Sequence, residues 1–408
     1  MPTVIPVIPQ RITVHLGSPS SSAQNVTVSF IDYVKNVASS EIYPTWEESA
    51  LRANILAIVS FALNRVYTEF YRSRGYDFDI TNSTAYDQFF VNGRSYFSNV
   101  ARIVDELFND YLRRPGFVEP LAAKFCNGTT AICEGLSQWG SQNLAQQGYS
   151  STQILRSYYG NVEIVNNAPI QNVTTSYPGT PLRRGTTGPS VVTIQVELNR
   201  ISQNYPAIPK IATVDGIFGA QTEAAVRKFQ EVFNLDVDGV VGRSTWYALI
   251  RYYTAVLSLS ELRSQGQRFY VNSWAVGDPI EQGDRGIKVE HLQYMLSVLS
   301  AYIPEIPSVE VDGIFGAATR NAVIAAQRRF DLPQTGVVNA ETWDEIYDQF
   351  SGIETISWRD PERFPYTSAI LGQTVPRARY SRTTTMTQFP GNSLSSGNQD
   401  PVRQEVIR

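Results

Sequence analysis

Apolar residues recur with helical spacing early in the chain. Between Leu51 and Phe70 an apolar residue returns every three or four positions, the period of one face of a helix. Thr45 and Glu48 precede this stretch with the spacing of a capping box, and Gly75 follows it as a stop signal. The pattern predicts one long helix between these signals.

Three shorter segments add to this picture. Residues 28–38 and 100–111 show the same helical period, whereas residues 12–16 alternate as a strand does. Together these segments predict a first domain of α+β class that is largely helical. We place it at residues 1–165, because residues 166–176, rich in Asn, Pro and Thr, have the composition of a linker.

The second half of the chain contains a repeat. The hexapeptide VDGIFG at residues 214–219 returns letter for letter at residues 311–316. The copies stay in register through Trp246 and Trp343. The Asp-Gly pairs suit turns with a positive φ, and the shared apolar residues have helical spacing. We expect two small helical domains with both tryptophans in their cores, although an exposed tryptophan would suit sugar stacking.

These repeated residues resemble the peptidoglycan-binding module of bacterial wall hydrolases. The resemblance implies two three-helix domains that bind peptidoglycan, often through its stem peptides. We call residues 177–255 the first module and residues 270–350 the second module. Residues 351–408 form a C-terminal extension, expected to be partly mobile, and its end resembles the opening of a third, truncated copy.

The first domain is similar to the stage II sporulation protein D family, whose members cut glycan strands of bacterial walls. The similarity rests on ASSEIYP at residues 38–44, ESALRAN at 48–54, GLSQWG at 135–140 and the closing ILRSYY at 154–159. Two features depart from the family pattern. Residues 131–133 replace its Gly-His-Gly, and the arginine expected late in the long helix falls near Val59.

The combination of domains most resembles the spore cortex-lytic transglycosylases of anaerobic spore formers. This resemblance implies a germination enzyme that acts outside the cytoplasm, in the spore cortex or coat. Its relatives are made as proenzymes with an additional N-terminal region, and this chain starts near the expected mature end. An activating protease is therefore an expected partner besides peptidoglycan.

Glu41, within the ASSEIYP motif, is the candidate general acid and base. A lytic transglycosylase needs one acid that protonates the leaving oxygen, because the sugar's own C6 hydroxyl then closes on C1. Apolar neighbours such as Ile42 and Trp46 would raise the pKa of Glu41, whereas a nearby helix N-terminus would lower it. The sequence leaves the balance open. Glu48 is interpreted as a helix cap.

Four further residues are candidates for binding sugar hydroxyls and N-acetyl groups: Tyr86, Gln88, Ser137 and Gln138. Ser137 suits a helix N-cap equally well. Asp87 and Glu134 are secondary candidates for an acid. Without the resemblance, Glu41 itself would be interpreted as a solvated loop acid.

Composition excludes several classes of function. With 408 residues and a net charge of −4, the chain has no basic stripe for nucleic acid, and no apolar run approaches the roughly 20 residues of a membrane span. His15 and His291 are far apart, so neither a metal nor another cofactor is expected. Cys126 and Cys133 suit a local disulfide or two buried thiols.

The sequence therefore predicts a peptidoglycan lytic transglycosylase that uses Glu41 and is held on the wall by two modules. The alternative is a non-catalytic wall-binding protein or an activator of a separate amidase. A zinc amidase acting alone is disfavoured because the sequence lacks clustered ligands.

Overall fold

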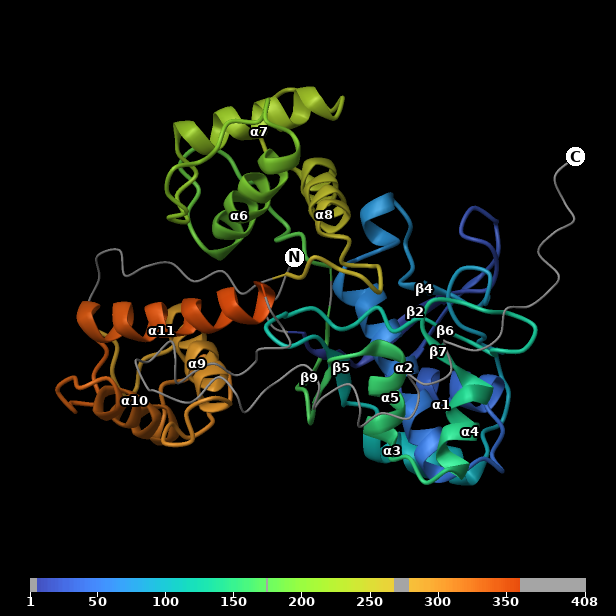
Figure 1. The fold of residues 1–408 in the computed structure, drawn as a ribbon. Coiled ribbons are helices and arrows are strands. Elements are labelled where there is room, and N and C mark those ends of the chain that lie inside the picture. Colours follow the sequence, from blue (N-terminus) through green and yellow to red (C-terminus); the bar gives the residue numbers. More distant parts are fainter. Residues whose placement is uncertain (1–5, 174, 268–278, 360–408) are drawn as a thin grey trace, which may run out of the picture.

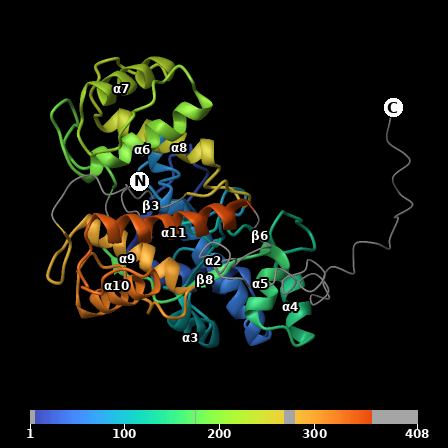
Figure 2. The same ribbon diagram turned by 60° about the vertical axis from the view of Figure 1, so that its left-hand side comes forward.

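The computed structural model describes residues 6–173, 175–267 and 279–359. Figure 1 shows three bodies: the first domain carries α1 to α5 and the strands, the first module carries α6 to α8, and the second module carries α9 to α11. Figure 2 shows the same separation from another side. The predicted α+β class is confirmed, with a largely helical first domain followed by two three-helix domains. The extension beyond residue 359 lies outside the described residues.

One helix, α2 (Glu48–Tyr67), forms the centre of the first domain. Sixteen of its twenty residues are buried, so it is apolar all round rather than on one face. Four helices pack around it in the described structure: α1 (Phe30–Glu41), α3 (Ser98–Leu107), α4 (Gln138–Gln146) and α5 (Ser151–Tyr159).

The ends of α2 differ from the prediction. Thr45 does not cap the helix; Glu47 holds the N-cap position without a side-chain hydrogen bond, and its backbone N–H donates to Gln142 Oε1 at 2.9 Å. The predicted capping box was therefore wrong. The helix ends at Tyr67, and Gly75 instead ends a short 3-10 helix, Arg72–Arg74.

Short strands complete the first domain. β2 (Arg11–His15) confirms the predicted strand and lies between β3 (Asn25–Ser29), antiparallel, and β4 (Ile80–Thr81), parallel. The helix expected from residue 28 begins at Phe30, because Ser29 accepts a hydrogen bond from the backbone of Asp32 and caps it. Three further pairs are β1 (Ile8–Pro9) with β9 (Ile170–Gln171), β5 (Tyr111–Arg113) with β8 (Glu163–Val165), and β6 (Phe125–Cys126) with β7 (Leu136–Ser137).

Each module repeats the same three-helix arrangement. The helices are α6 (Pro189–Asn204), α7 (Ala220–Val232) and α8 (Arg243–Leu257) in the first module, and α9 (Ile287–Ser300), α10 (Ala317–Arg329) and α11 (Ala340–Arg359) in the second. Trp246 and Trp343 are 2% and 3% exposed, which confirms that both are core residues.

A buried glutamine holds the Asp-Gly turn in each copy. In the first module, Gln195 accepts from the backbone of Gly216 and donates to Asp215. Gln293 does the same for Gly313 and Asp312 in the second module. Both glycines have the positive φ that the Asp-Gly pairs predicted, 72° and 69°.

The first module is joined to the first domain by buried polar contacts. The segment expected to be a linker, residues 166–176, includes β9, which pairs with β1, and Ser176, which donates to the carboxylate of Glu69. Trp246 in turn donates its ring N–H to Ser176 Oγ at 2.8 Å. The carboxylate of Glu119 accepts from Ser264 Oγ and from the backbone of Gln267. The two bodies therefore share a continuous interior.

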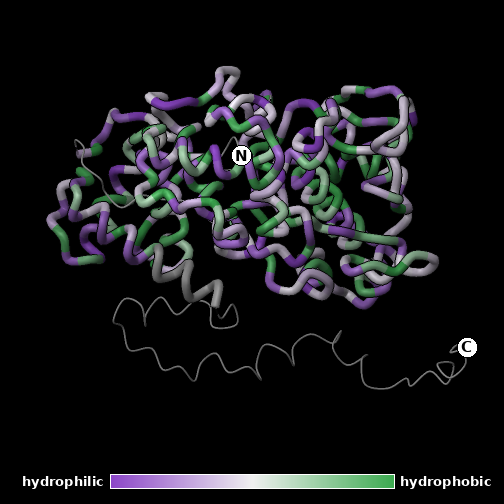
Figure 3. Tube along the Cα trace, turned by 90° about the horizontal axis from the view of Figure 1, so that it is seen from above, coloured by the Kyte–Doolittle hydropathy of each residue, from purple (hydrophilic) through white to green (hydrophobic). Residues whose placement is uncertain are grey.

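Hydrophobic and hydrophilic residues alternate along the trace (Figure 3). Among the described residues, no helix combines the length and apolar character that crossing a bilayer requires.

The junction predicts a pH-dependent stability. Burial raises the pKa of Glu119 from 4.5 to about 7, although its hydrogen bonds and Arg114 oppose this shift. Because the pKa of Glu119 is higher in the folded chain than in the unfolded chain, its protonated form contributes to the stability of the fold. This contribution is complete below the unfolded-state pKa of 4.5, and it is lost as the pH rises from 4.5 to about 7. The glutamine in Glu119→Gln does not titrate, so this variant does not lose stability in the same way. The free energy of unfolding of the variant minus that of the unaltered chain should therefore rise over this pH window by up to about 3 kcal/mol.

Urea denaturation at pH 5 and pH 8 measures this difference. Glu305→Gln is the matched control, because it makes the same change at an exposed glutamate. An effect of Glu119→Gln that does not change with pH contradicts the prediction.

Candidate functional site

The carboxylate of Glu41 is held by two segments that are distant in sequence. Glu41 is the last residue of α1. Its Oε1 accepts a hydrogen bond from the backbone of Phe89 at 2.9 Å, and its Oε2 accepts one from Gln138 Nε2 at 3.2 Å. The structure therefore brings two of the predicted site residues, Glu41 and Gln138, into direct contact.

Burial decides the ionisation of Glu41. It raises the pKa of this carboxyl above its ordinary value, while the bonds from Phe89 and Gln138 lower it and only partly compensate. Glu41 lies at the C-terminal end of α1, where the helix dipole disfavours a negative charge. Its contact with Gln138, the first residue of α4, also brings it beside a helix N-terminus, which favours one. The site is thus suited to holding a proton.

A buried ion pair fixes the loop that contacts Glu41. Asp87, a secondary acid candidate, accepts from Arg65 Nε at 2.8 Å, from Tyr71 Oη at 2.6 Å, and from the backbone and hydroxyl of Thr81. With the side chain of Asp87 fully buried and surrounded by donors, its place is structural. It sets the position of Phe89, two residues along the chain.

A disulfide supports the other side of the site. Cys126 and Cys133 are bonded, and neither is buried, so of the two alternatives the disulfide is correct. The disulfide closes a loop beside β7. Ser137, the last residue of β7, caps α4, because its hydroxyl accepts a hydrogen bond from the backbone N–H of Gly140 at 3.0 Å. Gln138 is the first residue of this helix, so the cap and the loop place its amide against Glu41.

The remaining predicted residues lie elsewhere. Gln88 is 0% exposed and exchanges hydrogen bonds with Tyr33 Oη and the carbonyl of Ile58, so it belongs to the core and does not face a ligand. Tyr86 is exposed. Glu134 is exposed and paired with Arg263. Glu48 bonds to both Arg52 and Arg102 on the surface rather than capping α2.

Sequence reasoning missed an aromatic cluster next to Glu41. The rings of Tyr43, Trp46 and Trp139 contact one another, with centroids 5.1 to 5.6 Å apart. The signal was available, because Tyr43 is two residues from Glu41 and Trp139 directly follows Gln138.

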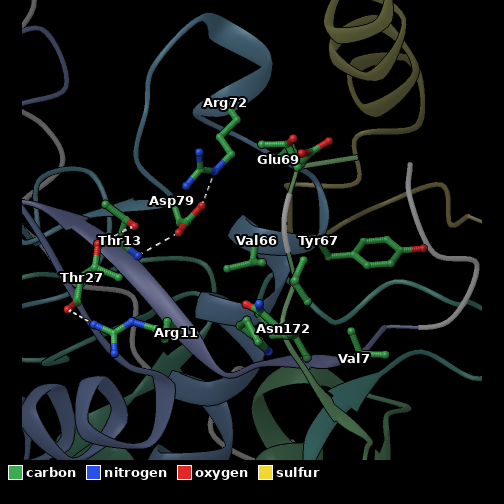
Figure 4. Close-up of a pocket in the computed structure, with 14 residues that line it drawn as sticks. Val7, Arg11, Thr13, Thr27, Val66, Tyr67, Glu69, Arg72, Asp79 and Asn172 are labelled. Carbon is green, nitrogen blue, oxygen red and sulfur yellow. Dashed lines mark hydrogen bonds and ion pairs between the residues drawn. The ribbon is translucent and has the colours of Figure 1, made fainter. Parts of the chain in front are cut away.

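A separate cavity of about 350 Å³ lies between β2 and the end of α2 (Figure 4). Its charged groups bind one another: Arg72 pairs with Asp79 at 2.6 Å, and Asp79 also accepts from the backbone of Thr13. Arg11 donates to the carbonyl of Thr27. Glu69 also lines this cavity; burial raises the pKa of its carboxyl, whose two oxygens accept from the backbone and the hydroxyl of Ser176. Within the described residues, no cluster of His, Cys, Asp and Glu could hold a metal ion.

Family models match three stretches of the chain. Residues 187–249 and 285–346 match the peptidoglycan binding domain family, and residues 20–106 match the stage II sporulation protein family. The chain thus carries a stage II sporulation protein domain and two peptidoglycan-binding domains. The stage II sporulation protein match includes α1, which ends at Glu41, and the region of Phe89.

Curated relatives share parts of the chain. The N-acetylmuramoyl-L-alanine amidase CwlM of Mycobacterium tuberculosis is 33% identical over 32% of this chain and 27% of its own length. The spore cortex-lytic enzyme of Bacillus cereus is 31% identical over 26% of this chain and 39% of its own. The chain therefore spans less than half of either relative. The N-acetylmuramoyl-L-alanine amidase CwlL of Bacillus licheniformis is 23% identical over 76% of this chain and 83% of its own length.

The geometry predicts the effect of removing one hydrogen bond. Gln138→Leu deletes a donor that favours the carboxylate, so the pKa of Glu41 should rise further. Carbon-13 NMR titration of the Glu41 carboxyl measures this shift. Gln142→Leu, one turn along α4 and bonded to Glu47 instead, should leave the pKa of Glu41 unchanged. A pKa that falls or stays constant in Gln138→Leu contradicts the assigned role.

Proposed function

We propose that this chain cleaves the glycan strands of peptidoglycan as a lytic transglycosylase, with Glu41 as general acid and base. The observation that carries the proposal is a single half-buried carboxylate whose pKa is raised and whose two oxygens are held by Phe89 and Gln138. The stage II sporulation protein match supports a sporulation role, and the two peptidoglycan-binding domains support peptidoglycan as the partner.

The reaction balances with one acid. Protonated Glu41 gives its proton to the glycosidic oxygen as the bond from that oxygen to C1 of muramic acid breaks. The C6 hydroxyl oxygen of the same sugar forms a bond to C1, and its proton passes to the Glu41 carboxylate. The product is a 1,6-anhydro end, and Glu41 returns to its protonated state without water being consumed.

The three other acids weighed from the sequence favour this one-carboxylate reaction over hydrolysis by two carboxylates. Hydrolysis needs a second carboxylate as base or nucleophile. Asp87 is buried among donors, Glu48 is paired with Arg52 and Arg102, and Glu134 is paired with Arg263. None of the three is available as the partner of Glu41.

The relatives' names favour a spore wall as the setting. The Bacillus cereus relative is named as a spore cortex-lytic enzyme, which supports the spore cortex as the setting. We further propose that the reaction occurs outside the cytoplasm during germination, after activation by a protease. Two other relatives are named as amidases. They favour a second candidate, a wall-binding protein or an activator of a separate amidase.

Product analysis tests the proposal. Glu41→Gln keeps the size of the side chain but cannot give or take a proton, and should lower the release of cortex fragments roughly 10²- to 10⁴-fold. Mass spectrometry of the soluble products should show 1,6-anhydro-muramic ends with the unaltered chain. Glu48→Gln, which changes an exposed glutamate seven residues away, is the matched control and should retain the activity.

Four results would contradict this proposal. Reducing muramic ends would indicate hydrolysis, and free stem peptides would indicate an amidase. Anhydro ends made equally well by Glu41→Gln would assign the chemistry to another residue. A faster partner amidase in the presence of either form, without fragments from the chain alone, would favour the activator.

A further inference from the structure

Exposed aromatic side chains gather in one part of the described structure. Six are exposed, and all belong to the first domain: Tyr43, Tyr86, Phe89, Tyr96, Phe97 and Trp139. The described residues of the two modules have no exposed aromatic ring, and their tryptophans at positions 246 and 343 are buried. Large exposed rings that gather in one region typically mark a binding surface. Four of the six, Tyr43, Phe89, Phe97 and Trp139, lie in segments that contact Glu41 or the residues next to it.

One group of rings adjoins the Gln138 side of the carboxylate. Trp46 is nearly buried and supports the other two rings, while Tyr43 is 55% exposed and Trp139 is 40% exposed. The centroids of Tyr43 and Trp139 are 5.5 Å apart with the ring planes inclined at 47°. The backbone N–H of Trp139 donates to the carbonyl of Asn127 in the disulfide loop, so this loop holds the backbone of Trp139 in place.

A second group adjoins the Phe89 side. The backbone N–H of Phe89 binds Glu41 directly, and the backbone N–H of Phe97 binds Ser39 Oγ, two residues before Glu41. Arg94 lies 5.7 Å from the Phe97 ring and donates to Ser40 Oγ at 2.9 Å. Each group of rings is therefore attached to the same end of α1, and the carboxylate has one oxygen bonded on each side.

From this geometry we infer that Tyr43 and Trp139 form a stacking subsite for a sugar ring of the glycan strand next to the bond that Glu41 cleaves. The ligand class is a chain of β-linked, N-acetylated amino sugars. One face of such a ring carries C–H groups, which pack on an aromatic face, while its hydroxyls remain in water. Phe89 and Phe97 flank the next position of the same strand. This inference rests on the proposed function.

The subsite assigns glycan recognition to the first domain. The modules, with their tryptophans buried in the described structure, hold the wall by other groups. Aromatic side chains suit this task because a rigid ring supplies a large contact area at little cost in side-chain entropy. Neither ring is needed to support the core, because both Tyr43 and Trp139 lie against Trp46 at the surface.

Binding measured in the full chain carrying Glu41→Gln tests this subsite without turnover. The probe is a peptide-free tetrasaccharide of alternating N-acetylglucosamine and N-acetylmuramic acid, titrated by calorimetry. Tyr43→Ala and Trp139→Ala in this background should each weaken binding at least about tenfold. Tyr43→Phe and Trp139→Phe, which keep a ring, should bind within about threefold of the parent. Thermal unfolding confirms that each variant is folded.

Two results would overturn the inference. Alanine variants that bind as tightly as the parent would show that the rings do not contact the glycan. Phenylalanine variants that lose as much affinity as the alanine variants would assign the contact to the tyrosine hydroxyl and the indole N–H rather than to stacking.

The same variants made with Glu41 intact separate this inference from the proposed function. If fragments are released only with Glu41 but the alanine variants bind and react normally, the subsite fails and the reaction stands. If Glu41→Gln remains active while the alanine variants lose affinity, the reaction fails and the subsite stands. With both correct, Trp139→Ala should raise KM for the soluble glycan more than it lowers kcat.

Discussion

The first domain depends on a helix that is buried on every side. Residues 53–65 of α2 are all buried, and polar side chains in this stretch bond to the elements around the helix. Asn54 donates to Ser141 of α4 at 2.7 Å, and Ser60 Oγ accepts from the backbone of Leu112 in β5. Arg65 binds Asp87 in the loop that follows β4. These bonds fix where each neighbouring element lies along α2, which apolar packing alone would leave adjustable.

The site at Glu41 follows from two of these bonds. Asn54 holds α4, whose first residue is Gln138, and Arg65 holds the loop that presents the N–H of Phe89. The two segments meet at the end of α1, which is itself packed on α2. Glu41 is thus desolvated by elements whose positions are set elsewhere. Burial can then outweigh two hydrogen bonds to the carboxylate, which by themselves would keep it ionised.

Sequence reasoning succeeded where a local pattern determines the structure. The repeat, the Asp-Gly turns and the core tryptophans of the modules follow from spacing alone, and so does the strand at residues 12–16. It failed where a distant partner decides. Gln142 occupies the N–H of Glu47 that begins α2, so Thr45 is not needed as a cap. Tyr33 and the carbonyl of Ile58 hold Gln88 in the core, although its motif places it beside exposed residues. The contact of Glu41 with Gln138 joins residues 97 positions apart and had no local signal.

The contacts between the modules and the first domain bear on why the chain carries two copies of the module. Two binding domains on flexible tethers raise the local concentration of an insoluble polymer, and the gain depends on linker length. Here Asn64 of α2 donates to the carbonyls of both Pro120 and Leu259, and Val118 of the first domain packs into the core of the second module. Both modules are therefore packed against the first domain rather than tethered to it by a flexible segment alone. The gain that depends on linker length does not describe this arrangement, because the contacts at the junction set how the modules lie relative to the first domain.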